Sequence, residues 1–130
     1  CVDCRTPTEF HYDVAKAAIS NFNCNVFIEK PITETTIQAD RLIEEAKKKN
    51  LIIQVGHIER LNPALKVLDK YDLSPKFIDI QRLAPYTVRG TDVPVVLDLM
   101  IHDIDILLSL VQSKVKSIHA SGVSILTNSV

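Results

Sequence analysis

Residues 96–110, VLDLMIHDIDILLSL, place a histidine and three aspartates inside a run that is otherwise almost wholly apolar. In a helix, Asp98, His102 and Asp105 share one face, because they are separated by four and then three residues. Asp103 lies about 100° away from His102 around the same helix. A buried carboxylate is costly unless it is paired or hydrogen-bonded. We therefore expect this face to line a cleft.

Two other interpretations of this face stay open. His102 can be a core histidine bridged to Asp98, with Asp105 capping a neighbouring element. Histidine and aspartate at helical spacing can also ligate zinc or iron. However, His57 and His119 do not stand in a ligand spacing with this face. We therefore predict no metal site.

A second group of polar residues follows two predicted strands. In FIEKPIT, residues 27–33, Glu29 and Lys30 end a strand, and Pro31 restricts the chain that follows. TPTEFH, residues 6–11, ends the strand before it. Ligands bind at the carboxyl edge of open parallel sheets, so both turns are expected to face one crevice. The alternative is a solvated lysine and ordinary turn chemistry.

The elements that must position these residues alternate regularly over 1–58. CVDC, NVFIEK and LIIQVGH predict strands, and the segments between them have helical periodicity, with Thr8 and Thr33 as expected N-caps. This order is typical of a parallel sheet with crossover helices, here the second half of an α/β domain. The second helix is expected to bury Ile37, Leu42, Ile43 and Ala46 on one face.

The pattern changes in 59–130, which we predict to be the start of an α+β domain. Asn62 and Pro63 predict a helix start, and KFIDIQRL alternates as a strand with one solvated face. A loop over 84–94, a helix over 94–111 and one or two strands in VKSIHASGVSIL follow.

Composition narrows the class of protein. Hydrophobic residues make up 46%, charged residues 24%, and the net charge is -1, which is typical of a globular protein and gives no footprint for nucleic acid. Three aspartates argue against a membrane span over 93–111. Three cysteines without a partner pair, and no signal peptide, favour a reducing compartment; we expect a cytoplasmic protein.

TPTEFH, VFIEKPIT, VGHIERLNPA and VLDLMIHDIDILL occur in the order found in the glucose–fructose oxidoreductase and inositol dehydrogenase family, which the chain resembles over almost its whole length. GHIERLNPA is most similar to UDP-N-acetylglucosamine 3-dehydrogenase-like members, which act on nucleotide-linked sugars. The resemblance implies a Rossmann domain that binds NAD or NADP. It also implies a substrate domain with an antiparallel sheet through which copies form a homo-oligomer.

By position, the resemblance implies catalytic roles for Lys30, Asp98 and His102. It implies cofactor contacts for Thr6, Pro7, His11, Glu29, Lys30 and Pro31, and substrate contacts for Arg60, Asn62, Arg82 and Asp105. Hydride transfer from a sugar carbon requires loss of the hydroxyl proton, which an imidazole is suited to take. Asp98 would then orient the ring of His102, and Lys30 would polarise the oxygen. Whether Lys30 or His102 is the base stays open.

The family's Gly-x-Gly-x-x-Gly turn has no counterpart here. The glycines are Gly56, Gly90 and Gly122, and none stands in a phosphate-binding arrangement. We therefore expect a fragment that, alone, binds dinucleotide poorly and does not turn over. Two further hypotheses are a non-catalytic relative or assembly module that keeps the same framework, and, less favoured, a metal-dependent hydrolase.

Overall fold

The computed structural model describes residues 1–83 and 94–123. The chain divides into two compact units, Cys1–His57 and Ile58–Val130. Among the described residues, no helix is long and apolar enough to cross a membrane.

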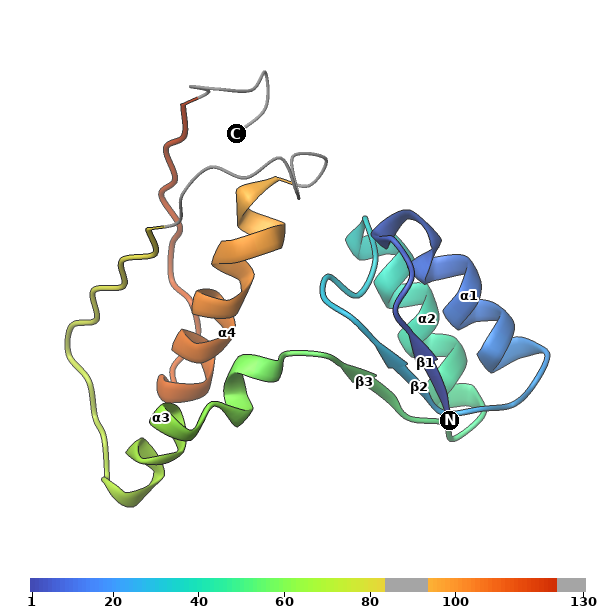
Figure 1. Ribbon diagram of the computed structural model, residues 1–130, viewed down its shortest axis with the longest axis horizontal. Helices are drawn as coiled ribbons and strands as arrows, with labels where there is room; N and C mark the ends of the chain where they lie inside the picture. The colour runs from blue at the N-terminus through green and yellow to red at the C-terminus, as the bar shows by residue number, and fades with distance from the viewer. Residues whose placement is uncertain (84–93, 124–130) are drawn as a thin grey trace. The chain divides into compact units, whose positions relative to one another are not determined.

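The first unit is a three-stranded parallel sheet with two helices. Its elements in chain order are β1 (Val2–Cys4), α1 (Thr8–Ser20), β2 (Val26–Ile28), α2 (Thr36–Lys48) and β3 (Ile53–Val55). The strand order is β1-β2-β3, and α1 and α2 pack side by side against it (Figure 1). The predicted alternation of strands and crossover helices is confirmed.

The two faces of this sheet differ in composition. In β2, Val26 and Ile28 are buried, while Phe27 between them points to the other face and is half-buried. The register gives every strand the same alternation, because residues paired across neighbouring strands lie on the same face. The helix-covered face carries Val2, Cys4, Val26, Ile28, Ile53 and Val55, and the opposite face carries Asp3, Phe27 and Gln54.

Both predicted N-caps were misplaced. The N-cap of α1 is Pro7, and Thr8 is the first helical residue. The N-cap of α2 is Thr35, which forms a capping box with Gln38. A capping box needs a Gln or Glu three residues after the cap, and Thr35 has one where Thr33 does not. Thr33 is instead buried, and its hydroxyl donates to the Thr35 carbonyl at 2.8 Å.

Half of the predicted face of α2 lies in the core. Leu42 and Ala46 are buried, at 0% and 3% exposure. Ile37 and Ile43 remain exposed, so their predicted burial was wrong. Among the described residues, the sheet has only three strands. The stripe of α2 that is buried therefore includes Leu42 and Ala46 but not Ile37 and Ile43.

The second unit is built mainly of short helices. They are η1 (Ile58–Leu61), α3 (Pro63–Lys66), η2 (Leu68–Lys70), the π-helical turn η3 (Val96–Met100) and α4 (Ile101–Leu110). The predicted start at Asn62 and Pro63 is confirmed, since the Asn62 side chain accepts from the Ala64 amide at 3.0 Å. The helix predicted over 94–111 is present, but its first part is a π-turn.

The predicted strands of this unit are not formed in the described residues. Neither 76–83 nor 112–123 contains a strand. A strand is stabilised by pairing with another, and these segments leave apolar side chains in solvent: Phe77 is 86% exposed and Ile118 is 81% exposed. Predictions for 84–93 and 124–130 lie outside the described residues.

Candidate functional site

The carboxyl edge of the first unit's sheet brings three loops together. Thr6 and Pro7 follow β1, Glu29–Pro31 follow β2, and Gly56 follows β3. Backbone hydrogen bonds extend the pairing past the strand ends, from Glu29 N to Cys4 O (3.1 Å) and from Gly56 N to Ile28 O (2.8 Å). The predicted convergence of the first two loops at one edge therefore holds within this unit.

The side chains at this edge differ in accessibility. Thr6 and Pro7 are exposed, Glu29 and Lys30 are half-buried, and Pro31 is buried behind a cis peptide bond. A half-buried lysine has fewer conformations than a lysine on an exposed helix face. Lys30 is thus suited to hold an ammonium group at one place on the edge.

Gly56 is a residue of this edge that sequence reasoning missed. A Cβ at this position would lie 3.0 Å from Glu29 Oε2 and 3.1 Å from Phe27 Cζ. The absence of a side chain therefore makes room for the Glu29 carboxylate beside the third strand. The available signal was a glycine near the end of the predicted strand LIIQVGH, where close backbone approach is common.

His11 is buried beneath the first two loops, with 1% of its surface exposed. Its Nδ1 lies 2.8 Å from the Pro31 carbonyl oxygen, and its Nε2 lies 2.9 Å from the Thr6 carbonyl oxygen. The resemblance implied that His11 contacts the cofactor. The structure places its ring against the backbone of both loops.

In the second unit, η3 and α4 carry the polar face predicted from the sequence. Asp98 and His102 are half-buried, and Asp105 is 8% exposed. Asp105 accepts hydrogen bonds from both Nε and Nη2 of Arg60, each at 2.6 Å. These bonds raise the pKa of the Arg60 guanidinium. The ion pair accounts for the burial of this carboxylate without a ligand.

Replacing Arg60 by alanine is expected to destabilise the protein by about 2 kcal/mol, because it removes the two Arg60 hydrogen bonds from the buried Asp105 carboxylate. The value lies below that of a fully buried pair, since the Arg60 side chain is 54% exposed. The double variant Arg60→Ala/Asp105→Leu should recover most of this loss. Chemical denaturation of the four proteins measures the coupling, and additive effects would contradict the pairing.

Arg82 and Asp103 form a second two-pronged ion pair. Arg82 Nε and Nη2 donate to the two carboxylate oxygens of Asp103 at 2.7 and 2.6 Å. The bonds raise the pKa of Arg82 and lower that of Asp103. Asp103 is thus engaged with a partner of its own, in keeping with the prediction that it lies off the face of Asp98 and His102.

The lowered pKa of Asp103 gives a contribution to stability that depends on pH. Its folded pKa lies below the ordinary value of 3.8, so the stabilisation is complete above that value and is lost as pH falls through the folded pKa. Wild type should exceed Asp103→Asn in stability by about 1 kcal/mol at neutral pH. Urea unfolding at several pH values measures this difference; a gap that does not shrink in acid would refute the assignment.

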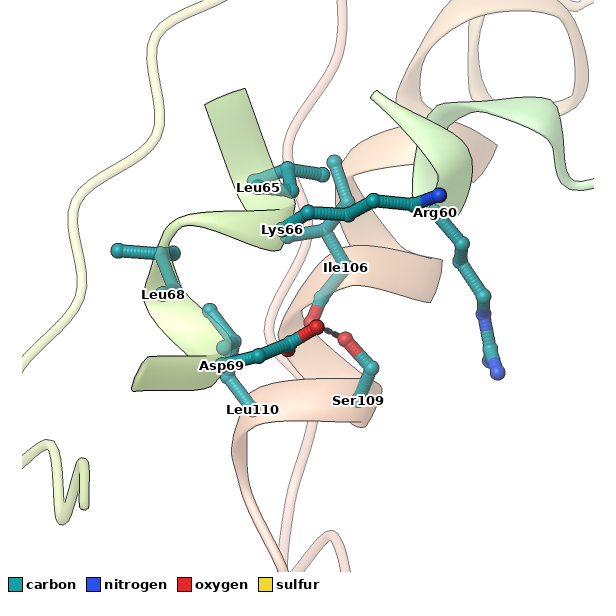
Figure 2. Close-up of a pocket in the computed structure, with 8 residues that line it drawn as sticks. All are labelled: Arg60, Leu65, Lys66, Leu68, Asp69, Ile106, Ser109 and Leu110. Carbon is teal, nitrogen blue, oxygen red and sulfur yellow. Dashed lines mark hydrogen bonds between the residues drawn. The ribbon is translucent and has the colours of Figure 1, made fainter. Parts of the chain in front are cut away.

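A hollow of about 190 Å³ lies among α3, η2 and α4 in the second unit (Figure 2). Its lining is largely apolar, with Leu65, Leu68, Ile106 and Leu110. Binding pockets for small molecules usually enclose about 300 Å³ or more. Of the predicted site residues in the described part of the chain, only Arg60 borders this hollow, and we assign it to packing.

The residues present fit one end of a dinucleotide. The two loops at the carboxyl edge supply an exposed turn and a half-buried lysine, which suit the nicotinamide end. These 130 residues contain no Gly-x-Gly-x-x-Gly motif for the phosphates. Across 1–83 and 94–123, no group of three or more His, Cys, Asp or Glu side chains is arranged to hold a metal ion.

Comparison with known proteins agrees with this geometry. The sequence profile of the oxidoreductase family with an NAD-binding Rossmann fold matches residues 1–57. The chain is 38% identical over 125 residues to UDP-N-acetylglucosamine 3-dehydrogenase of Acidithiobacillus ferrooxidans, covering 95% of this chain and 39% of that protein. It is 28% identical over 126 residues to scyllo-inositol 2-dehydrogenase (NAD(+)) of Bacillus subtilis, covering 90% and 36%.

A solved structure shows the same fold. The crystallised Acidithiobacillus ferrooxidans enzyme superimposes with a TM-score of 0.90 at 37% identity, over 98% of this chain and 42% of the other. The chain thus spans about two fifths of the length of these relatives.

Proposed function

We propose, from the match of residues 1–57 to the oxidoreductase family with an NAD-binding Rossmann fold, that this chain is part of a longer dehydrogenase of that family. The reaction is hydride transfer between NAD or NADP and the hydroxyl carbon of a sugar, nucleotide sugar or cyclitol. The observation that carries the proposal is the carboxyl edge of the parallel sheet, where the Thr6–Pro7 and Glu29–Pro31 loops start from neighbouring strands.

The proposed catalytic roles fall on Lys30, Asp98 and His102. NAD(P), when bound, accepts or supplies the hydride. The Lys30 ammonium polarises the substrate oxygen and stabilises the negative charge that develops on it. His102 takes the hydroxyl proton, and Asp98, one turn earlier on the helix, orients the imidazole and stabilises its charged form.

Four residues are proposed for the substrate side: Arg60, Asn62, Arg82 and Asp105. Each has a partner within its own unit, which holds it in place. An arginine that donates two of its N–H groups to a carboxylate has further N–H groups that can donate to a ligand. Nucleotide-linked sugars carry phosphates, which guanidinium groups recognise well. The relative in Acidithiobacillus ferrooxidans bears the name of an enzyme for such a sugar.

An assembly role is the second candidate, supported by exposed apolar side chains in the segments without strands. Phe77 and Leu83 are 86% and 91% exposed, and Val115, Ile118 and Val123 exceed half exposure. Exposed apolar side chains that lie together are typical of surfaces that another segment or another copy covers. We propose that these segments belong to an antiparallel sheet that also joins copies into a homo-oligomer.

A fusion tests the enzymatic proposal. Residues 1–130 replace the aligned segment of the Acidithiobacillus ferrooxidans enzyme, and reduced cofactor is measured with UDP-N-acetylglucosamine or scyllo-inositol, each with NAD and NADP. Turnover with the nucleotide sugar alone supports that substrate class, and turnover with the cyclitol alone replaces it. A folded fusion that binds cofactor and turns over neither substrate contradicts the proposal.

A further inference from the structure

His11 joins the two loops that carry the proposed site. It lies in the first turns of α1 and is 1% exposed. One ring nitrogen faces the carbonyl of Thr6, in the loop after β1, and the other faces the carbonyl of Pro31, in the loop after β2. A single side chain therefore spans the gap between neighbouring loops at the carboxyl edge of the sheet.

The bonding partners fix the chemistry of this ring. A carbonyl oxygen only accepts hydrogen bonds, and a neutral imidazole has one N–H, so it can donate to one of the two carbonyls. The distances of 2.8 and 2.9 Å are those of hydrogen bonds on both sides. With either nitrogen carrying the hydrogen, the ring is hydrogen-bonded to one loop while its other nitrogen lies against the second loop.

We propose that His11 is a positioning residue that, by lying between the Thr6 and Pro31 carbonyls, sets the distance between the Thr6–Pro7 loop and the Lys30–Pro31 loop. It acts through these loops and does not touch substrate or cofactor. This inference rests on the proposed function for its consequence in catalysis. Its structural part, the position of the ring between the two loop carbonyls, is independent of that function.

The position of the second loop matters because Lys30, the proposed catalytic residue, directly precedes Pro31, whose carbonyl contacts the His11 ring. Misplacing a catalytic group by about 1 Å can lower a rate by about 10²-fold. Loss of the ring's hydrogen bonds should therefore lower kcat more than it weakens cofactor binding, since the loops themselves remain.

Three variants in the fusion test the proposal. His11→Phe keeps the ring's bulk and loses both ring nitrogens, whereas His11→Gln keeps an NH₂ group that can reach a carbonyl. Ala15→Gly, one turn later in α1 at a residue with 0% exposure, is the control for a general loss of stability. We expect kcat to fall about 10- to 100-fold in His11→Phe, less in His11→Gln, and little in Ala15→Gly. Equal effects of His11→Phe and Ala15→Gly would overturn the proposal.

A second measurement does not depend on activity. Amide hydrogen exchange in the 130-residue chain should be faster in both loops of His11→Phe than in wild type, and Ala15→Gly should not show this local increase. Unchanged exchange in both loops of His11→Phe would overturn the proposal. If the wild-type fusion does not turn over while the exchange result is as expected, the proposed function fails and the link between the loops stands.

Discussion

Replacing Lys30 by alanine is expected to lower kcat of the fusion by about 10³-fold, the cost of removing a group that stabilises charge on the reacting oxygen. The half-buried position of Lys30 at the carboxyl edge of the sheet supports this role. Cofactor affinity should change far less, because the proposed role is greatest in the transition state. Steady-state kinetics, with a separate titration of the reduced cofactor, distinguish the two effects.

The control for this substitution is Lys48→Ala, which removes an exposed lysine near the end of α2. Its kcat should match that of wild type. A Lys30→Ala protein with unchanged kcat would remove Lys30 from the mechanism and favour the solvated lysine considered from the sequence.

His102→Ala is expected to lower kcat by about 10²- to 10⁴-fold, the usual contribution of a general acid–base residue. The ring is half-buried on α4, and Asp98 lies one turn earlier on η3. If His102 is the base, raising the pH should restore part of the rate in the variant, because hydroxide ion can then take the proton. The pH profile of kcat measures this.

His119→Asn is the matched control, because His119 is exposed in the described part of the second unit. It should keep the wild-type rate and pH profile. If His102→Ala retains the wild-type rate at all pH values, then His102 is a core histidine and Lys30 becomes the remaining candidate for the base.

The sequence predicted the elements of the first unit well because its signals are local. Apolar strands of a few residues, helical periodicity and turn residues follow one another at short range, and the parallel sheet follows from their order. The caps were harder to predict: Thr33 and Thr35 are both plausible, and only the reciprocal bond to Gln38 selects Thr35.

The second unit shows which structural features local sequence patterns do not predict. KFIDIQRL alternates like a strand, but alternation gives a strand only where another strand pairs with it, and the described residues provide none. The ion pairs of Asp105 and Asp103 were missed for a similar reason. Their arginines, Arg60 and Arg82, lie 45 and 21 residues away in sequence, and no periodicity links positions that far apart.

The central claim is that this chain supplies the groups that carry out hydride transfer. The most direct measurement uses a sugar labelled with deuterium at the reacting carbon and follows the label into the reduced cofactor. It compares the wild-type fusion with the fusion carrying Lys30→Ala and His102→Ala. We expect transfer by the first and a rate at least about 10³-fold lower in the second. Equal transfer by both proteins would contradict it.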